Sequence, residues 1–406
     1  MPRPTLGIVT TWFQRGAAYV SKAYAHALEE DFNIRIYARG GEILPIGDPN
    51  WDVREVHWGE FVPGARKTFI DWQDFKSWID REEIDILLFN EQQSWDAVIR
   101  CKQELTIPIG SYLDFYTAES IPFFGLYDYL LCNTQRHFAA FEWHSGAIYV
   151  PWGVQLDEFR DNKLELDHFF FHNCGFNPYR KGTDLLIEAF VGLDAKGSTL
   201  LIHSQRQLSE FPDLEVAVRN NPNITWHIED VEPPGLYQRG EVFVYPSRLD
   251  GLGLSLPEAL ANGLPSIAPD EAPMNEFLKN GQNGKLARVS KNWQREDGFY
   301  WPMNEVDVTD LKRCMQEFWD ERSELDTWKK RTFEMATNNL DWNINTAGLG
   351  QKLRGVKAQT VDQNLILECA RWEVKTSPQP TFSQKVHRVL ISLGARKVKR
   401  SLFGRA

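Results

Sequence analysis

The chain has 406 residues, which is enough for two domains of common size, each with its own hydrophobic core. Its net charge of −11 argues against nucleic-acid binding, which needs a basic surface. Its five cysteines are scattered without a C-x-x-C pair, and no apolar run is long enough to cross a bilayer. These features predict reduced thiols and a cytoplasmic location.

The N-terminal half alternates strand and helix patterns. One helix is expected to place Val20, Ala23, Tyr24, Ala27 and Leu28 on one face, and an aromatic-rich helical stretch is expected over residues 65–80. Apolar runs predict strands at residues 6–10, 34–38, 84–89, 107–112, 129–132 and 147–150. Strands that alternate with helices indicate an α/β domain with a parallel sheet covered on both faces.

The segment PWGVQLDEF at residues 151–159 interrupts this pattern, and a polar stretch follows it. A second alternating series begins with a strand at residues 168–174 and runs to about residue 340. After a loop at residues 175–182, a helix is expected to start near Thr183, which is a favourable N-cap residue. The chain is therefore predicted to contain a second domain of the same α/β class.

The most informative segment is VFVYPSRLDGLGLSLPEALANGLPSIAPDEAPMNE, residues 242–276. It predicts a strand at 242–245, a glycine-bearing loop, a helix opened by Pro257 and closed at Asn262-Gly263, and a strand at 266–268. Asp250 and Glu258 stand on the two sides of the loop-to-helix junction. Helix amino termini attract anions and a carboxylate there can hold a diol, so the segment suits a sugar nucleotide. The alternative is an ordinary β–α turn whose acids face solvent.

This segment resembles the donor-binding motif of retaining glycosyltransferases of the GT-B fold, in particular family 4, glycosyl transferases group 1. The motif has two acids spaced by seven residues, and this chain carries Asp250 where the first is usually glutamate. The chain keeps the following motif residues: Pro246, Ser247, Gly251, Gly253, Leu254, Glu258, Ala259, Ala261, Gly263 and Pro265.

The resemblance implies an enzyme that transfers a sugar, as a hexosyltransferase would, from a nucleotide-sugar to a glycan, lipid-linked or other acceptor with retention at the anomeric carbon. Such an activity is typical of polysaccharide biosynthesis. It also implies two Rossmann-like domains that face each other across a cleft, with a C-terminal helix crossing back. The expected divisions are an acceptor domain at 1–155, a donor domain at 156–340, a crossover helix at 341–375 and a tail at 376–406.

For the donor's ribose and sugar, the resemblance implies contacts in and after the motif. Glu258 is expected to bind the ribose and Asp250 to contact the sugar, and both are expected to contribute to catalysis together with Lys181. The further donor contacts implied are Gly253, Leu254, Ser255 and Glu276.

For the diphosphate, Gly175, Lys181 and Gly182 of this chain match a second short sequence motif of the family. The resemblance therefore implies that Lys181 binds the phosphates. The family's arginine falls on Phe176, and Arg180 is a candidate substitute because it lies just before a helix start, where its charge and the amide dipoles can act on one anion. Arg15 and Gly16 match the family's glycine-rich loop near the donor phosphate.

A mid-domain histidine of the family is absent from this chain, and Asp114 is the candidate sugar contact in its place; the alternative for Asp114 is an ordinary acid at a strand end. No D-x-D sequence occurs, so no bound divalent metal and no other cofactor is expected. The cations and helix amino termini would then neutralise the diphosphate.

Two other functions remain open. The substitutions at Phe176 and Asp250 and the missing histidine also suit a catalytically degenerate protein that binds a nucleotide-sugar or glycan. A sugar-nucleotide epimerase of similar fold is the third candidate.

The tail segment 385–406 has seven basic residues and no acid, with apolar residues at roughly helical spacing. It either lies on an anionic membrane surface, which would make the protein peripheral at the inner membrane face, or forms a solvated tail.

Overall fold

The computed structural model describes residues 3–63, 65, 68–160, 166–231 and 234–376. Their contacts divide the chain into two compact units. The first unit comprises the described residues within Met1–Leu113, Ser120–Leu130 and Leu349–Ala406, and the second those within Asp114–Glu119 and Leu131–Gly348. The sequence-based domain division, with its boundary at residues 155 and 156, stays a prediction.

A seven-stranded sheet has the strand order β3-β2-β1-β4-β5-β6-β7. In this sheet β1 pairs in parallel with β2 and with β4, β2 pairs in parallel with β3, and β4 pairs in parallel with β5. The strands are β1 (Thr5–Thr10), β2 (Asn33–Ala38), β3 (Val56–Trp58), β4 (Ile86–Asn90), β5 (Ile109–Tyr112), β6 (Tyr129–Cys132) and β7 (Ala147–Tyr149).

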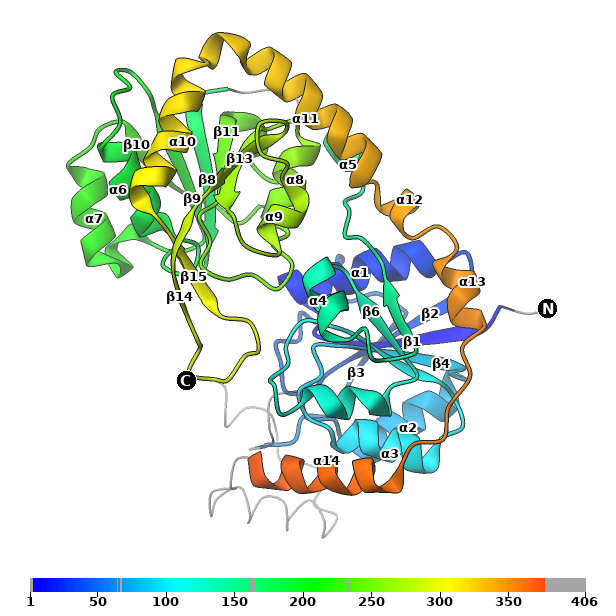
Figure 1. Ribbon diagram of the computed structural model, residues 1–406. Coiled ribbons are helices and arrows are strands. Elements are labelled where there is room, and N and C mark those ends of the chain that lie inside the picture. The colour runs from blue at the N-terminus through cyan, green and yellow to red at the C-terminus, as the bar shows by residue number, and fades with distance from the viewer. Residues whose placement is uncertain (1–2, 64, 66–67, 161–165, 232–233, 377–406) are drawn as a thin grey trace. The chain divides into compact units, whose positions relative to one another are not determined.

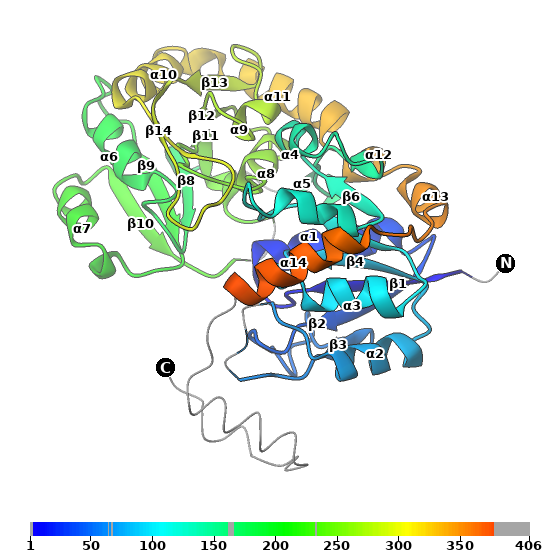
Figure 2. The same ribbon diagram turned by 60° about the horizontal axis from the view of Figure 1, so that its bottom comes forward.

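The helices of the first unit bury the apolar sheet positions. α1 packs against β1, and α14 lies along α3 and the 3-10 helix η1, as Figure 2 shows for α14 and α3. Segments far apart in the sequence thus form one core, because α14 follows α3 by more than 250 residues. These helices are α1 (Gly16–Leu28), α2 (Trp72–Arg81), α3 (Asp96–Glu104), η1 (Ile121–Leu126), α13 (Leu349–Arg354) and α14 (Gln363–Thr376).

The second sheet is parallel and six-stranded, in the order β10-β9-β8-β11-β12-β13. Its central strands are buried on both faces, as expected for a parallel sheet between two helix layers. The strands are β8 (His168–Gly175), β9 (Leu200–Ser204), β10 (Ile224–Ile228), β11 (Gly240–Val244), β12 (Ser266–Pro269) and β13 (Gly284–Ala287).

Two hydrophobic clusters cover the faces of this sheet. Besides strand residues, one cluster contains residues of α6, α7 and α10, and the other contains residues of α8 and α9; α11 contributes to both. Figure 1 shows α6 and α7 on one side of the sheet and α8 and α9 on the other. The helical segments here are α4 (Gln135–Ala140), α5 (Asp157–Arg160), α6 (Thr183–Val191), η2 (Leu208–Glu210), α7 (Pro212–Arg219), η3 (Tyr237–Arg239), α8 (Ser255–Ala261), α9 (Met274–Phe277), α10 (Val308–Asp320), η4 (Arg322–Glu324), α11 (Leu325–Asn339) and α12 (Trp342–Asn345).

An antiparallel hairpin stands apart from the parallel sheet, between β13 and α10. It consists of β14 (Val289–Trp293) and β15 (Met303–Val306), and it forms its own two-stranded sheet. At its tip the Tyr300 N–H donates to the carbonyl of Tyr116 at 2.9 Å, and Phe299 forms a bridge with Thr117. The hairpin therefore ties the short segment Asp114–Glu119 into the second unit.

The alternating pattern of the sequence is confirmed, and the strands predicted from apolar runs are present within a few residues. The helical stretch expected at 65–80 is wrong at its start, because the helix begins at Trp72, capped by Asp71, whose side chain accepts from the Asp74 N–H. Among the described residues, no helix is long and apolar enough to span a membrane. The basic segment 385–406 lies outside the described residues.

Candidate active site

The loop from β11 to α8 forms much as the sequence predicts. Gly263 has φ 75° directly after the C-cap Asn262, the left-handed conformation that ends helices at little cost for glycine. The helix itself begins at Ser255, so the predicted start at Pro257 is wrong by two residues. Proline is tolerated there because the N–H groups of the first turn have no partner within the helix. Gly253, with φ 75°, and Leu254 lead into this helix, and their donor-binding role stays a prediction.

Asp250 lies at the centre of a buried network. Its carboxylate accepts from the Nζ of Lys181 at 2.9 and 3.1 Å, and from a terminal nitrogen of Arg180 at 2.9 Å. The hydroxyls of Ser247 and Tyr245 each donate to it at 2.6 Å. Removal from water would raise the pKa of Asp250, but the two cations and the hydroxyl donors hold it well below its usual value. Asp250 is therefore an anion, and it is paired with Lys181 and Arg180, the two residues expected to bind the phosphates.

Lys181 is as buried as Asp250, and each has 9% of its surface exposed. Its ammonium also donates to the hydroxyl of Tyr245 and lies 4.7 Å from the centre of that ring. Burial lowers the pKa of Lys181 to about 8, although the charge of Asp250 acts in the opposite direction. The ammonium of Lys181 is thus hydrogen-bonded to the carboxylate of Asp250.

The helix that follows Lys181 is capped differently from the prediction. Its N-cap is Gly182, at φ 72°, and the predicted cap Thr183 is the first helical residue. The Thr183 hydroxyl is instead 2.9 Å from Nε2 of His172, whose Nδ1 is 2.7 Å from the carbonyl of Val244. A carbonyl can only accept, so Nδ1 carries the proton and Thr183 donates to Nε2. Burial lowers the pKa of His172 to about 4, so this histidine is neutral and joins β8, β11 and α6.

Glu258 has a partner that the sequence did not reveal. Its carboxylate accepts from the hydroxyl of Tyr237 at 2.6 Å, and Tyr237 is 2% exposed. Removal from water raises the pKa of Glu258 to about 7, against the effects of that hydrogen bond and of the charge on Lys181. The candidate ribose ligand therefore changes its charge near neutral pH.

Glu276 lies at the amino end of α4. It accepts from the backbone N–H groups of Gln135, at 2.5 Å, and Arg136, at 3.0 Å. The guanidinium of Arg136 in turn donates at 2.6 Å to the carbonyls of Asp250 and Ala272, and it lies 4.9 Å from the centre of the Trp301 indole. Arg136 is a residue that sequence reasoning missed, and it links the loop of Asp250 with the loop of Glu276.

Asp114 reaches the same loop. A Cβ atom on Gly251 would lie 2.0 Å from Oδ1 of Asp114, so the carboxylate packs directly on the backbone at this glycine. The negative charge of Asp114 also acts on Arg136 and Arg180. The structure thus brings together Asp114, Asp250, Arg180 and Lys181, whereas the role of Asp114 as a sugar contact stays a prediction.

Arg15 and Gly16 belong to the first unit. Arg15 is the N-cap residue of α1, without a side-chain cap, and Gly16 is the first residue of the helix. The guanidinium of Arg15 is 3.1 Å from the carboxylate of Glu91. Phe176, which stands at the position of the family's arginine in the second unit, is 60% exposed. Arg180, not Phe176, is therefore the charged neighbour of Lys181 in this loop.

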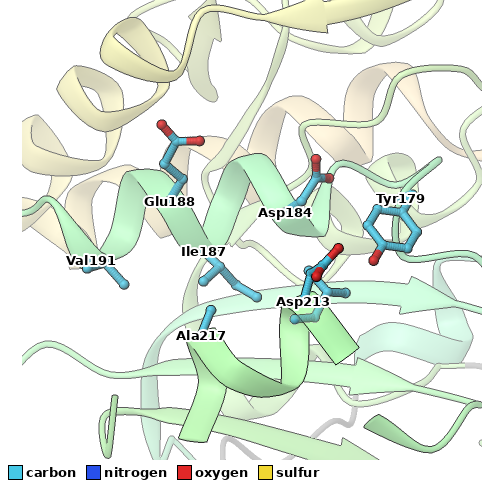
Figure 3. Close-up of a pocket in the computed structure, with 8 residues that line it drawn as sticks. Tyr179, Asp184, Ile187, Glu188, Val191, Asp213 and Ala217 are labelled. Atoms are coloured by element: carbon cyan, nitrogen blue, oxygen red, sulfur yellow. The ribbon is translucent and has the colours of Figure 1, made fainter. Parts of the chain in front are cut away.

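A cavity of about 470 Å³ lies between α6 and α7. Figure 3 shows the side chains that line it. Tyr179 lies at one end and Val191 at the other, with acidic side chains from both helices around the apolar Ile187. None of the residues assigned to the donor lines this cavity. Its acidic rim makes it unsuited to a diphosphate.

Residues 155–295 match the model of a family described as glycosyl transferases group 1. No curated protein matches the chain. Similar solved structures include a glycosyltransferase from Rickettsia africae, with 11% identity and a TM-score of 0.70 over 87% of this chain and 99% of that one. Sucrose-phosphate synthase from Thermosynechococcus elongatus has 16% identity and a TM-score of 0.66, over 87% of this chain and 99% of that one.

A third similar structure is HepE from Anabaena in complex with UDP and glucose, with 13% identity and a TM-score of 0.67 over 87% of this chain and 100% of that one. At these identities the likeness shows the fold. The prediction of two Rossmann-like α/β domains in the GT-B arrangement of elements is confirmed.

Proposed function

We propose that this chain, which has the GT-B fold and matches the glycosyl transferases group 1 model over residues 155–295, transfers a sugar from a nucleotide-sugar to an acceptor. The observation that supports the proposal most directly is the placement of Lys181 and Arg180 beside Asp250, on the loop between β8 and α6. Two cations at this position can neutralise a diphosphate as it leaves the sugar.

In this proposal the donor's ribose hydroxyls donate to Glu258, which Tyr237 orients. Lys181 and Arg180 bind the diphosphate, and Asp250 holds both cations in place before the donor arrives. Transfer occurs with retention at the anomeric carbon. Lys181 and Arg180 neutralise the charge of the phosphates, so no divalent metal is needed to bridge them. The acceptor is a glycan or a lipid-linked sugar. A protein that only binds nucleotide-sugars would keep the same donor contacts, and product formation separates the two.

The proposal predicts a nucleotide-dependent gain in thermal stability. A ligand at a hundred times its Kd stabilises the native state by about 2.7 kcal/mol. We therefore expect one of UDP, GDP or ADP, or a sugar ester of it, to raise the Tm of the chain by several degrees, equally with and without EDTA. A stabilisation that EDTA abolishes would contradict metal-independent binding, and no response to any nucleotide would contradict the proposed function.

The proposal also predicts a bell-shaped pH profile of kcat/KM. Glu258 accepts from ribose hydroxyls only as a carboxylate, so activity should rise with pH as this group loses its proton near pH 7. Lys181 neutralises phosphate only as an ammonium, so activity should fall as its proton leaves near pH 8. Steady-state assays from pH 5.5 to 9.5 should place the maximum between these values. In the Glu258→Gln variant, the rise of kcat/KM between low pH and pH 7 should disappear. If the rise is unchanged in that variant, a group other than Glu258 causes it.

A further inference from the structure

A second cavity, of about 440 Å³, adjoins Arg180 on the second unit. It is formed by the β8–α6 loop with Asn177, by the β11–α8 loop with Arg248, and by the tip of the β14–β15 hairpin with Arg295. Volumes of about 300–1,000 Å³ are typical of small-molecule sites. The hairpin lies outside the six-stranded sheet, so part of this cavity is an addition to the parallel core.

Arg248 fastens the walls of the cavity. Its guanidinium donates to both oxygens of Asp184 at 2.7 and 2.8 Å, to Glu305 of β15 at 2.9 and 3.0 Å, and to the carbonyl of Tyr179 at 2.5 Å. The N–H of Asn304 donates back to the Arg248 carbonyl at 2.8 Å. All N–H groups of this arginine are therefore used within the protein, and its role is to hold the hairpin against α6.

Arg180 and Arg295 are different, because each keeps unused donors. Nη1 of Arg180 donates to Leu249 and Asp250, and the described residues offer no acceptor to its Nε or Nη2. Arg295 uses Nη2 on Asp297, while its Nε and Nη1 have no acceptor in the described part of the chain. Both side chains are about a third exposed, and no carboxylate is among the described residues that line the cavity.

The geometry points to an anion subsite: we propose that this cavity binds an oxyanion, a phosphate or a carboxylate, carried by the sugar acceptor. Guanidinium forks match the planar edges of such groups. The donor's diphosphate is assigned to Lys181 and Arg180 and its ribose to Glu258, and of these only Arg180 lines the cavity. The subsite therefore borders the donor site and shares this one arginine with it. The acceptor assignment rests on the proposed function, and the binding of the anion does not.

The subsite is tested by titrating the full chain calorimetrically with glucose 6-phosphate, glucuronic acid and glucose. Each titration is run with and without a saturating concentration of the nucleoside diphosphate that stabilises the chain. We expect one or both anionic sugars to bind in both conditions and glucose to bind in neither. Binding of only the phosphorylated sugar would identify a phosphorylated acceptor, and binding of only the uronic acid a carboxylated one.

Arg295→Gln is expected to weaken the binding of the anionic sugar by about tenfold or more, since it removes a charged donor fork. Arg288→Gln is the matched control and should not change the binding of the anionic sugar, because Arg288 directly precedes the hairpin, is mostly exposed and does not line the cavity. A second variant, Asn177→Asp, adds a negative charge to the wall of the cavity. It keeps the side-chain oxygen that accepts from the backbone N–H of Arg180 at 2.9 Å, so it tests the effect of charge without removing that contact. It should weaken binding as much as Arg295→Gln does.

Three outcomes would overturn the subsite. These are absent binding of both anions, equal binding of glucose, or displacement of the anion by the nucleoside diphosphate, which would make the cavity part of the donor site. If no nucleotide binds, the proposed function fails, while the titrations without nucleotide still decide whether the anion subsite exists.

Discussion

Lys181→Met should lower kcat/KM by at least about a hundredfold, because loss of one donor to the developing negative charge costs about 3 kcal/mol of transition-state stabilisation. Methionine keeps the apolar stem of the side chain against the Tyr245 ring and removes only the ammonium. Substrate saturation curves should show that kcat falls, because the charge on the diphosphate increases as the glycosidic bond breaks. An unchanged kcat with a raised KM would mean that Lys181 contributes only ground-state binding.

The same substitution should also destabilise the fold, because it leaves Asp250 with fewer partners in a buried position. Breaking a buried ion pair from one side costs about 3–5 kcal/mol, although Arg180, Ser247 and Tyr245 still donate to the carboxylate and should keep the loss near the lower end. Urea denaturation at pH 7.5 measures this loss.

The double variant Lys181→Met with Asp250→Asn separates the two effects. It removes both charges, so most of the lost stability should return, whereas the activity should not. Recovery of activity in the double variant would contradict the phosphate role, since it would show that Lys181 serves only to neutralise Asp250.

The order of strands and helices could be predicted from the sequence because local patterns determine it. Apolar runs of four to six residues mark the parallel strands, and glycines mark the positions with positive φ, as at Gly182, Gly253 and Gly263. The hairpin at residues 289–306 was not predicted. β14 has the sequence VSKNW with mostly exposed side chains, so it carries no apolar run to mark it as a strand.

The site was predictable only in part, because its electrostatics depend on partners far apart in the chain. The motif identified Asp250 and Glu258, but spacing within the motif cannot show that Asp250 is bonded to Lys181, 69 residues earlier. Tyr237 and Arg136 lie outside the matched motif, so no local signal indicated them. Thr183 was assigned as a cap from its residue type, and the assignment failed because a buried imidazole nitrogen of His172 competes for its hydroxyl.

Gly182→Ala should be among the most damaging single-methyl changes in this protein. Gly182 has φ 72°, and a Cβ atom there would lie 2.0 Å from the carbonyl oxygen of Pro246. Strain in the left-handed region costs about 1 kcal/mol, and forcing the two loops apart adds about 1–3 kcal/mol. The free energy of unfolding should therefore fall by about 2–4 kcal/mol, and kcat/KM should fall with it because the Lys181 and Asp250 loops separate.

Gly197→Ala provides the matched control for this prediction. Gly197 has φ 87° in the same unit, and no heavy atom lies within 4 Å of the position of its Cβ. Its substitution should cost only the backbone strain of about 1 kcal/mol and leave activity unchanged. The difference between the two variants in urea denaturation then isolates the close approach of the two loops. Equal losses of stability in the two variants would show that backbone strain alone explains the effect of Gly182→Ala. The close approach of Gly182 to Pro246 would then not be what keeps Lys181 next to Asp250.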